Sequence, residues 1–111
     1  TREYMTEDCD VAVISFGATA RAARAAAMLA REEGIRAGCL TIITMWPFPD
    51  AAVERVCSRA KAVVVPEMNL GQVAGEVKRA ACPRRIVGVN KVNGEGIKPA
   101  EVLEAIRRSL A

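Results

Sequence analysis

The run of three β-branched residues at positions 63–65 constrains the fold of this chain more than any other stretch. Consecutive valines with no polar alternation are typical of a strand that is buried on both faces of a parallel sheet. We expect Pro66 to end this strand, because proline has no N–H to donate to a neighbouring strand. Residues 67–72 then follow the carboxyl end of a strand, where ligands and partners gather in open parallel sheets.

Three further apolar runs alternate with stretches of helical periodicity. Strands are predicted at 11–15, 37–43 and 86–89, and helices at about 20–33, 50–60, 70–81 and 99–110. Because strands and helices alternate, we predict the α/β class with a mostly parallel sheet. Gly34 is placed to end the first helix and Asp50 to N-cap the second, and Gly71 and Gly75 are placed to allow close backbone approach in the third.

The chain length of 111 residues matches the size of one domain. Residues 1–10 are polar and mixed, so we assign them to a lead-in or an edge strand. Residues 11–111 are assigned to a single α/β domain.

The composition argues against several classes of function. The net charge is only +3 and the arginines are spread over several predicted helices, so nucleic acid is not an expected partner. There is no histidine, and the cysteines stand far apart, at Cys9, Cys39, Cys57 and Cys82. Zinc and iron–sulfur clusters are bound by closely spaced ligands, so we expect no metal site and buried free thiols instead. With no membrane-length apolar run and no visible signal peptide, we expect a cytoplasmic protein without a membrane partner.

The segment Gly17, Ala18 and Thr19 is a candidate for phosphate binding, because it follows a predicted strand and opens a helix. Backbone N–H groups at a helix N-terminus attract anions. The segment lacks the three glycines of the dinucleotide-binding fingerprint, and the chain has no P-loop run. The alternative is a tight strand-to-helix turn in which Thr19 satisfies an early helix N–H.

No residue is assigned a catalytic role. Ser15 lies at a predicted strand end, but the chain has no histidine to act as its base. Glu67 is either a general acid or base, or a carboxylate beside the next helix N-terminus or in an interface. The last two are favoured, because no second carboxylate is evidently paired with it. Trp46 and Phe48, on a loop with two prolines, either cover the domain's own core or anchor a neighbouring domain.

Four stretches of the chain resemble one family. They are S-F-G-A-T-A at 15–20, W-P-F-P at 46–49, P-E-M-N-L-G-Q at 66–72, and the closing stretch 90–104 with Gly94, Gly96 and Pro99. From about residue 10 to the end, they look like the C-terminal part of the alpha subunit of 2-oxoacid:ferredoxin oxidoreductases, closest to the 2-oxoglutarate type. The resemblance implies a fold like the transketolase C-terminal domain. That fold is a three-layer α/β/α sandwich with four to five mostly parallel strands and one antiparallel edge strand.

The resemblance also implies a role. Such enzymes oxidatively decarboxylate a 2-oxoacid on thiamine diphosphate with Mg²⁺, pass electrons through Fe–S clusters to ferredoxin, and form an acyl-coenzyme A. This chain has no G-D-G…N-N cofactor motif and no cluster cysteines, so it resembles a non-catalytic scaffolding and interface domain that itself binds none of these cofactors. Its expected partners are the N-terminal domain of the same subunit, the beta subunit and, where one exists, a gamma subunit, with ferredoxin reached through the complex. The residues expected at the interface are Trp46, Pro47, Phe48, Glu67, Met68, Asn69 and Gln72.

Two other interpretations stay open. One is an independent nucleotide- or coenzyme-binding module that uses residues 17–19. The other is the equivalent domain of another thiamine-dependent enzyme, such as a dehydrogenase beta subunit or a transketolase. No substrate-contacting residue can be identified, so the sequence does not indicate which 2-oxoacid is used.

Overall fold

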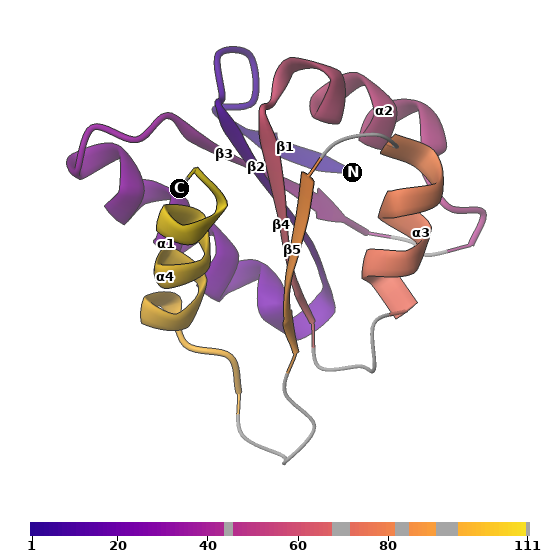
Figure 1. Cartoon of the computed structure of the whole chain (residues 1–111). Coiled ribbons are helices and arrows are strands. Elements are labelled where there is room, and N and C mark those ends of the chain that lie inside the picture. The colour runs from indigo at the N-terminus through magenta and orange to yellow at the C-terminus, as the bar shows by residue number, and fades with distance from the viewer. Residues whose placement is uncertain (44–45, 68–71, 82–84, 91–95, 111) are drawn as a thin grey trace.

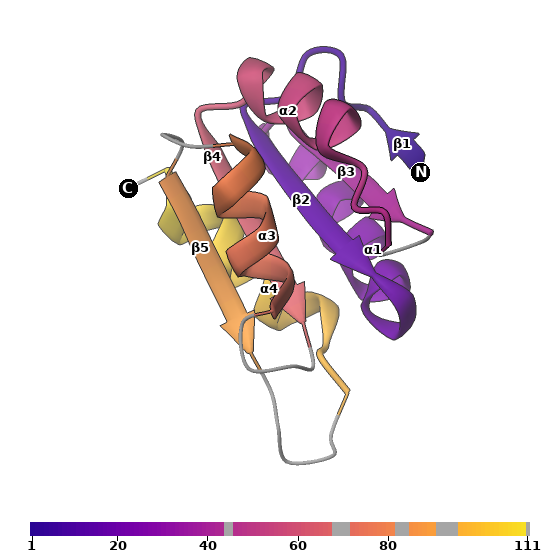
Figure 2. The same cartoon turned by 90° about the vertical axis from the view of Figure 1, so that its right-hand side faces the viewer.

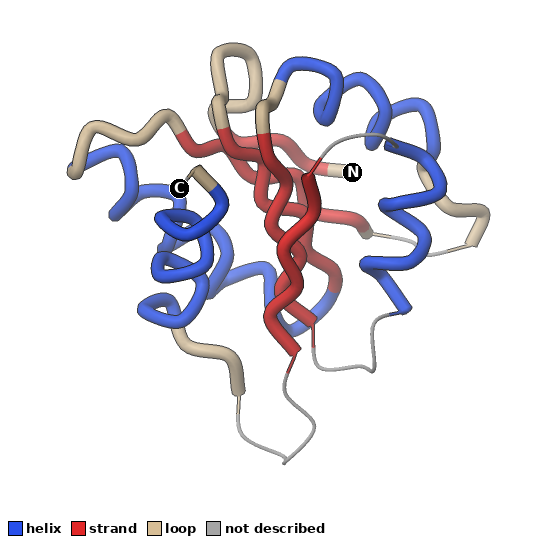
Figure 3. Tube along the Cα trace, in the orientation of Figure 1, coloured by secondary structure: helices blue, strands red, loops and turns tan. Residues whose placement is uncertain are grey.

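The computed structural model describes residues 1–43, 46–67, 72–81, 85–90 and 96–110, and helices cover both faces of a central sheet (Figure 1; Figure 3). In chain order the elements are β1 (Arg2–Tyr4), β2 (Val11–Phe16), the 3₁₀ turn η1 (Gly17–Thr19), α1 (Ala20–Glu32), β3 (Ala37–Ile42), α2 (Asp50–Arg59), β4 (Ala62–Glu67), α3 (Gln72–Ala81), β5 (Arg85–Asn90) and α4 (Pro99–Ser109).

Within the described residues, the strands form one five-stranded sheet in the order β1-β3-β2-β4-β5 (Figure 2). The strands β2 to β5 are parallel to their neighbours, and β1 is antiparallel to β3. The α/β class, the mostly parallel sheet and the antiparallel edge strand are therefore confirmed. Residues 2–4 follow the edge-strand alternative rather than forming a lead-in without secondary structure.

The sheet has an apolar core on each face, because successive residues of a strand point to opposite sides. On the side of α2 and α3, Ile14 and Leu40 pack with Val53 and Val73. On the side of α1 and α4, the buried strand residues include Val11, Val13, Cys39 and Val64. Ser15 and Thr41 each lie two residues after a member of the second core. Their side chains therefore also point to the α1 side of the sheet.

The inner face of α1 consists of alanines. Its buried residues are Ala22, Ala23, Ala26, Ala27 and Ala30. Arg31 fastens the C-terminal end of the helix: its Nε donates to the Ala37 carbonyl at 2.9 Å and its Nη2 donates to the Met5 carbonyl at 2.9 Å. Gly34, with φ of +86°, then ends the helix in the left-handed conformation that favours glycine, as expected.

The prediction that Pro66 ends its strand is wrong, because β4 continues through Pro66 to Glu67. Among the described residues, the pairing of β4 with β2 extends only to Val64, while the pairing with β5 continues to the end of β4. Beyond Val64 the strand therefore has one partner, and a strand with one free side accommodates a residue without an N–H.

Two predictions about the helices are also wrong. Asp50 is the first residue of α2 rather than its N-cap, and its carboxylate accepts from Arg79 Nη2 of α3 at 2.7 Å. Gly75 is exposed, and the space that a side chain would occupy there is open, so this glycine does not mediate a close approach. The predicted start of the third helix at Leu70, and Gly71 of the same prediction, lie outside the described residues.

Cys9, Cys39 and Cys57 are buried, as expected. The fourth, Cys82, lies outside the described residues. In the described part of the chain, no helix has the length and apolar character needed to cross a membrane.

Candidate functional site

The candidate site is the edge of the sheet where the parallel strands β2 to β5 have their carboxyl ends (Figure 2). Three segments singled out by the sequence follow these ends. The turn η1 follows β2, the loop containing Trp46 follows β3, and Glu67 is the last residue of β4. The sheet topology therefore brings them to one edge, as open parallel sheets do with functional residues.

The turn η1 is held by its own backbone and by Thr19. Gly17 has φ of +66°, a conformation that favours glycine, and the Thr19 hydroxyl donates to the Phe16 carbonyl at 3.1 Å. The expectation that Thr19 satisfies an early helix N–H is wrong, because its hydroxyl is a donor to the preceding strand. Gly17 and Ala18 are exposed, and Thr19 is buried.

Glu67 caps the first turn of α3. Its side chain is buried, with Oε1 accepting from the Val73 N–H at 2.9 Å and Oε2 accepting from the Ala74 N–H at 3.0 Å. A carboxylate at this position also interacts favourably with the positive end of the helix dipole. The structure thus gives Glu67 the helix-terminus role that the sequence analysis favoured over a general acid or base.

The two aromatic residues of the loop after β3 differ in burial: one covers the domain's own core, and the other is exposed. Phe48 is 9% exposed and belongs to the core beside α2 and α3, where Arg79 Cζ lies 5.8 Å from its ring centroid. Trp46 is 69% exposed, and Ile43, at the start of the same loop, is 54% exposed. Phe48 therefore fastens the loop to the domain, while Trp46 stands in solvent.

The remaining residues expected at an interface fall into two groups. Pro47 and Gln72 are exposed. Met68 and Asn69 lie outside the described residues. Their interface role, and that of Trp46, stays a prediction.

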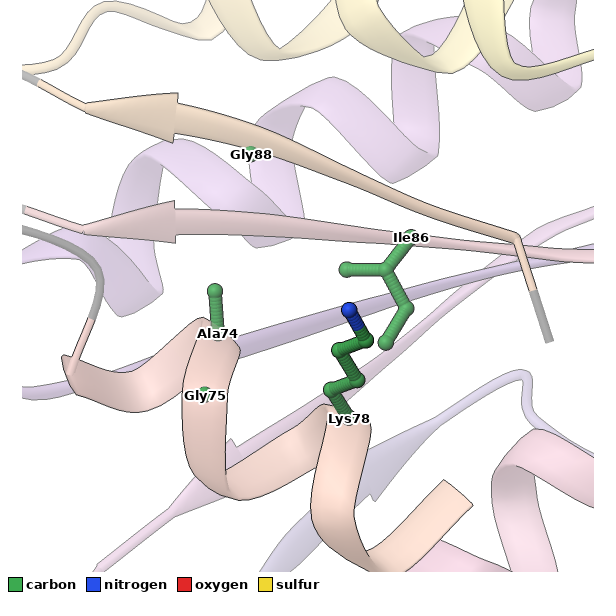
Figure 4. Close-up of a pocket in the computed structure, with 5 residues that line it drawn as sticks. All are labelled: Ala74, Gly75, Lys78, Ile86 and Gly88. Carbon is green, nitrogen blue, oxygen red and sulfur yellow. The ribbon is translucent and has the colours of Figure 1, made fainter. Parts of the chain in front are cut away.

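The described residues also form hollows that the sequence analysis missed. A large one, of about 1030 Å³, lies between the segment that follows β1 and α2, and two smaller ones lie against the sheet. One, of about 440 Å³, lies between α3 and the outer strand β5, where Ala74 and Lys78 face Ile86 and Gly88 (Figure 4). The other, of about 430 Å³, lies between the start of α1 and the strands β1 and β3. We call it the α1–β1 hollow. No sequence signal identifies any of them, because each is lined by segments that are separated in the chain.

The fold is shared with single domains of known enzymes. The structure is similar to 2-oxoglutarate:ferredoxin oxidoreductase from Magnetococcus marinus, solved with 2-oxoglutarate, coenzyme A and succinyl-CoA bound, with a TM-score of 0.81, 22% identity, and coverage of 94% of this chain and 18% of that one. It is also similar to a split-gene transketolase, an inactive beta4 tetramer, with a TM-score of 0.79, 27% identity, and coverage of 98% and 41%. The fold thus defines an α/β domain of the transketolase-like kind.

The sequence defines the family. Residues 9–102 match the pyruvate:ferredoxin oxidoreductase core domain II, and the chain belongs to this family. It is 43% identical to the 2-oxoglutarate synthase subunit KorA of Methanothermobacter thermautotrophicus, in an alignment of 106 residues that covers 95% of this chain. The chain spans 28% of the length of that relative. The resemblance stated from the sequence is therefore confirmed.

Proposed function

We propose that this chain is a non-catalytic interface domain in the alpha subunit of a cytoplasmic 2-oxoacid:ferredoxin oxidoreductase. The whole enzyme would use thiamine diphosphate to decarboxylate a 2-oxoacid such as 2-oxoglutarate oxidatively and form an acyl-coenzyme A. The name of the KorA relative supports this substrate class, and the family of core domain II supports this position in the subunit. The partners would be the N-terminal domain of the same subunit, the beta subunit and, where one exists, a gamma subunit.

The described residues do not fit the metal cofactors of such an enzyme. Within the described ranges, no three His, Cys, Asp or Glu side chains are grouped so as to hold a metal ion. Cys39 and Cys57 belong to cores on opposite faces of the sheet, so they cannot ligate one cluster. Burial raises the pKa of the Cys39 thiol, which disfavours the thiolate that a metal requires. We therefore assign the Fe–S clusters and Mg²⁺, together with the thiamine diphosphate that binds with it, to other parts of the complex.

The exposure of Trp46 is the observation that carries the interface role. A tryptophan that is 69% exposed leaves a large apolar surface in water, and buried tryptophans are among the strongest anchors of protein interfaces. The buried Phe48 holds the same loop to the domain, so Trp46 is presented on a segment that is already fastened. This arrangement lowers the entropy that the loop would lose on binding.

Replacing Trp46 in the full-length alpha subunit tests the proposal. We expect Trp46→Ala to weaken association with the beta subunit by about 30-fold, the size typical of an interface hot spot. Thermal stability of the unassembled subunit should change little, because the side chain is mostly in solvent. Association is measured by titrating labelled beta subunit, and stability by the unfolding midpoint.

Met28→Ala provides the matched control, because Met28 is also an exposed apolar residue, at 49%, but lies on α1. It should leave association unchanged. Unaltered association in Trp46→Ala, or an equal loss in the control, would contradict the interface role of this loop. A large loss of stability in the unassembled subunit would instead make Trp46 a folding residue.

A further inference from the structure

The α1–β1 hollow is lined by basic side chains from two elements. Arg2 comes from β1, and Arg21 and Arg24 come from the first two turns of α1. Arg24 Cζ lies 4.9 Å from the ring centroid of Tyr4, which also lines the hollow. Three guanidinium groups thus border a space of about 430 Å³.

Like Arg59 and Arg108, these three arginines form no ion pair with a described carboxylate. Ion pairs between described residues join carboxylates to Arg31, Arg36, Arg55, Arg79 and Arg107. Among the described residues, no carboxylate pairs with Arg2, Arg21 or Arg24. Glu3 also lines the hollow, but its carboxylate already accepts from Arg55 and from the Thr6 hydroxyl. The hollow therefore has an uncompensated positive charge.

The floor of the hollow is polar on the side that faces α1. The register places Arg2 opposite Thr41 and Thr41 beside Ser15, so these three residues form a row across β1, β3 and β2. Thr41 lines the hollow, and Ser15 behind it is fully buried. Among the described residues, Ser15 Oγ is the buried side-chain oxygen that meets no hydrogen-bond geometry, and it interacts weakly with the Cys39 thiol, which also lines the hollow. A buried hydroxyl without a hydrogen-bond partner is uncommon in folded proteins.

The backbone adds to this positive potential. The hollow lies at the first turns of α1, a helix of 13 residues whose first turn contains no acidic residue. The N-terminus of a helix carries about half a positive charge. The guanidinium groups and the helix end therefore act in the same direction on whatever enters the hollow.

We propose that the α1–β1 hollow binds the phosphate group of a small molecule. Arg21 and Arg24 supply the fork-shaped donors that match a phosphate, Arg2 approaches from the other side, and the Thr41 hydroxyl donates from the floor. A doubly charged phosphate would neutralise most of the charge of the three arginines. A single carboxylate from a neighbouring protein would leave most of that charge uncompensated. The site is independent of the proposed role of Trp46, so either proposal can fail alone.

Titration of the ¹⁵N-labelled 111-residue chain with inorganic phosphate and pyrophosphate tests the site. In 150 mM NaCl we expect saturable shifts of the amides of Thr41, Arg21 and Arg24, because the Debye length of about 8 Å at this salt screens non-specific attraction. The double variant Arg21→Gln/Arg24→Gln should bind at least tenfold more weakly. Arg2→Gln should also weaken binding. Because Arg2 lies in β1, this loss could not be caused by a folding defect in α1.

Arg108→Gln is the matched control, because Arg108 is exposed on α4 and does not line the hollow. It should bind phosphate as tightly as the unaltered chain. Shifts that do not saturate, or an equal loss in the control, would show attraction to net charge only and overturn the proposal. Acetate binding as tightly as phosphate would also overturn it, because the site would then be suited to a protein carboxylate.

Discussion

At the scale of the residue, Gly38 shows how a single position sets the path of the chain. Gly38 is buried in β3, and a methyl group there would lie 2.6 Å from the Met5 carbonyl oxygen and 3.0 Å from the Thr6 Cα. Both are backbone atoms, which cannot move aside as the end of a side chain can. The missing side chain of Gly38 therefore lets the segment after β1 lie close over β3.

Substitution of Gly38 is expected to destabilise the domain. Gly38→Ala should lower the free energy of unfolding by about 1–3 kcal/mol, the usual cost of overpacking. Gly75→Ala is the control, because Gly75 lies in α3 facing open space and alanine is the better helix former by about 0.5–1 kcal/mol. Urea denaturation of both variants checks the prediction, and a loss of stability in both would contradict the packing argument.

The sequence did not single out Gly38, although it singled out Gly34 correctly. Gly34 follows a helical pattern directly, so its role can be predicted from its neighbours. The role of Gly38 depends on Met5 and Thr6, which are distant in the chain and whose path no local pattern specifies. Thr19 gives a third case: its position was correct, but the direction of its hydrogen bond depended on the turn geometry.

At the scale of the element, α3 begins on the carboxylate of Glu67. This one side chain accepts from both the Val73 and the Ala74 N–H, so it satisfies two of the free donors at the helix N-terminus. The cap belongs to the preceding strand, and it therefore fixes the position of the helix relative to β4. Glu67 connects the two elements more directly than an isolated N-cap would.

Glu67→Gln is expected to loosen α3 specifically. The amide keeps one acceptor oxygen and turns the other into an NH₂ group facing a backbone N–H, so the free energy of unfolding should fall by about 1–2 kcal/mol. Hydrogen exchange at Val73 and Ala74 should become faster. Gln72→Ala, at an exposed position in the same turn, should leave both measurements nearly unchanged. Unaltered exchange in Glu67→Gln would contradict the capping role.

The elements themselves were largely predictable from hydrophobic periodicity. The buried runs in β2, β3 and β4 and the apolar faces of the helices occur where the sequence places them. Errors arose where an element's limit depends on its neighbours. Pro66 remains in β4 because the strand has lost its β2 partner by that point, and Asp50 pairs with a different helix instead of capping its own.

At the scale of the whole molecule, ion pairs join elements that are distant in the chain. Arg55 of α2 donates to Glu3 of β1 at 3.0 Å, and Arg107 of α4 pairs with Glu33 at the end of α1. The first of these pairs ties the edge strand to the helix layer on one face of the sheet. Because Glu3 titrates, this tie depends on pH.

The stability of the domain should fall in acid partly through Glu3. The Arg55 guanidinium and the Thr6 hydroxyl lower the pKa of Glu3 from 4.5 to about 2. Since the pKa is lower in the folded state, the contribution is complete above pH 4.5 and is lost as the pH falls toward 2. Glu3→Gln should therefore flatten the dependence of unfolding free energy on pH in this window. At pH 7 it should cost less than about 1 kcal/mol, because the pair is partly exposed.

Urea unfolding at a series of pH values checks this prediction. Glu54→Gln serves as the control, because Glu54 is exposed on α2 and has no ion pair among the described residues. It should leave the acid dependence intact. A Glu3→Gln profile that matches the unaltered chain would mean that the pair does not hold β1 in solution.

The candidate phosphate site could not have been predicted from the sequence. The sheet edge at the carboxyl ends of β2, β3 and β4 could be. The edge follows from parallel topology alone, which periodicity predicts. The hollow requires that β1 turn back antiparallel beside β3, which places Arg2 opposite Thr41. A three-residue edge strand has too short a pattern to indicate its partner or its direction.

The alanine face of α1 has a consequence for where its arginines stand. Small, similar side chains set the height of a helix above a sheet but leave its position along its own axis weakly defined, because a shift by one turn of 5.4 Å meets nearly the same surface. Arg31 fixes the position of α1 along its axis at the C-terminal end, because it donates hydrogen bonds to the Ala37 and Met5 carbonyls. The helix is rigid, so the same contact fixes Arg21 and Arg24 at the opposite end. The hydrogen bonds of Arg31 would thus determine where Arg21 and Arg24 lie beside the hollow, although Arg31 itself is at the other end of the helix.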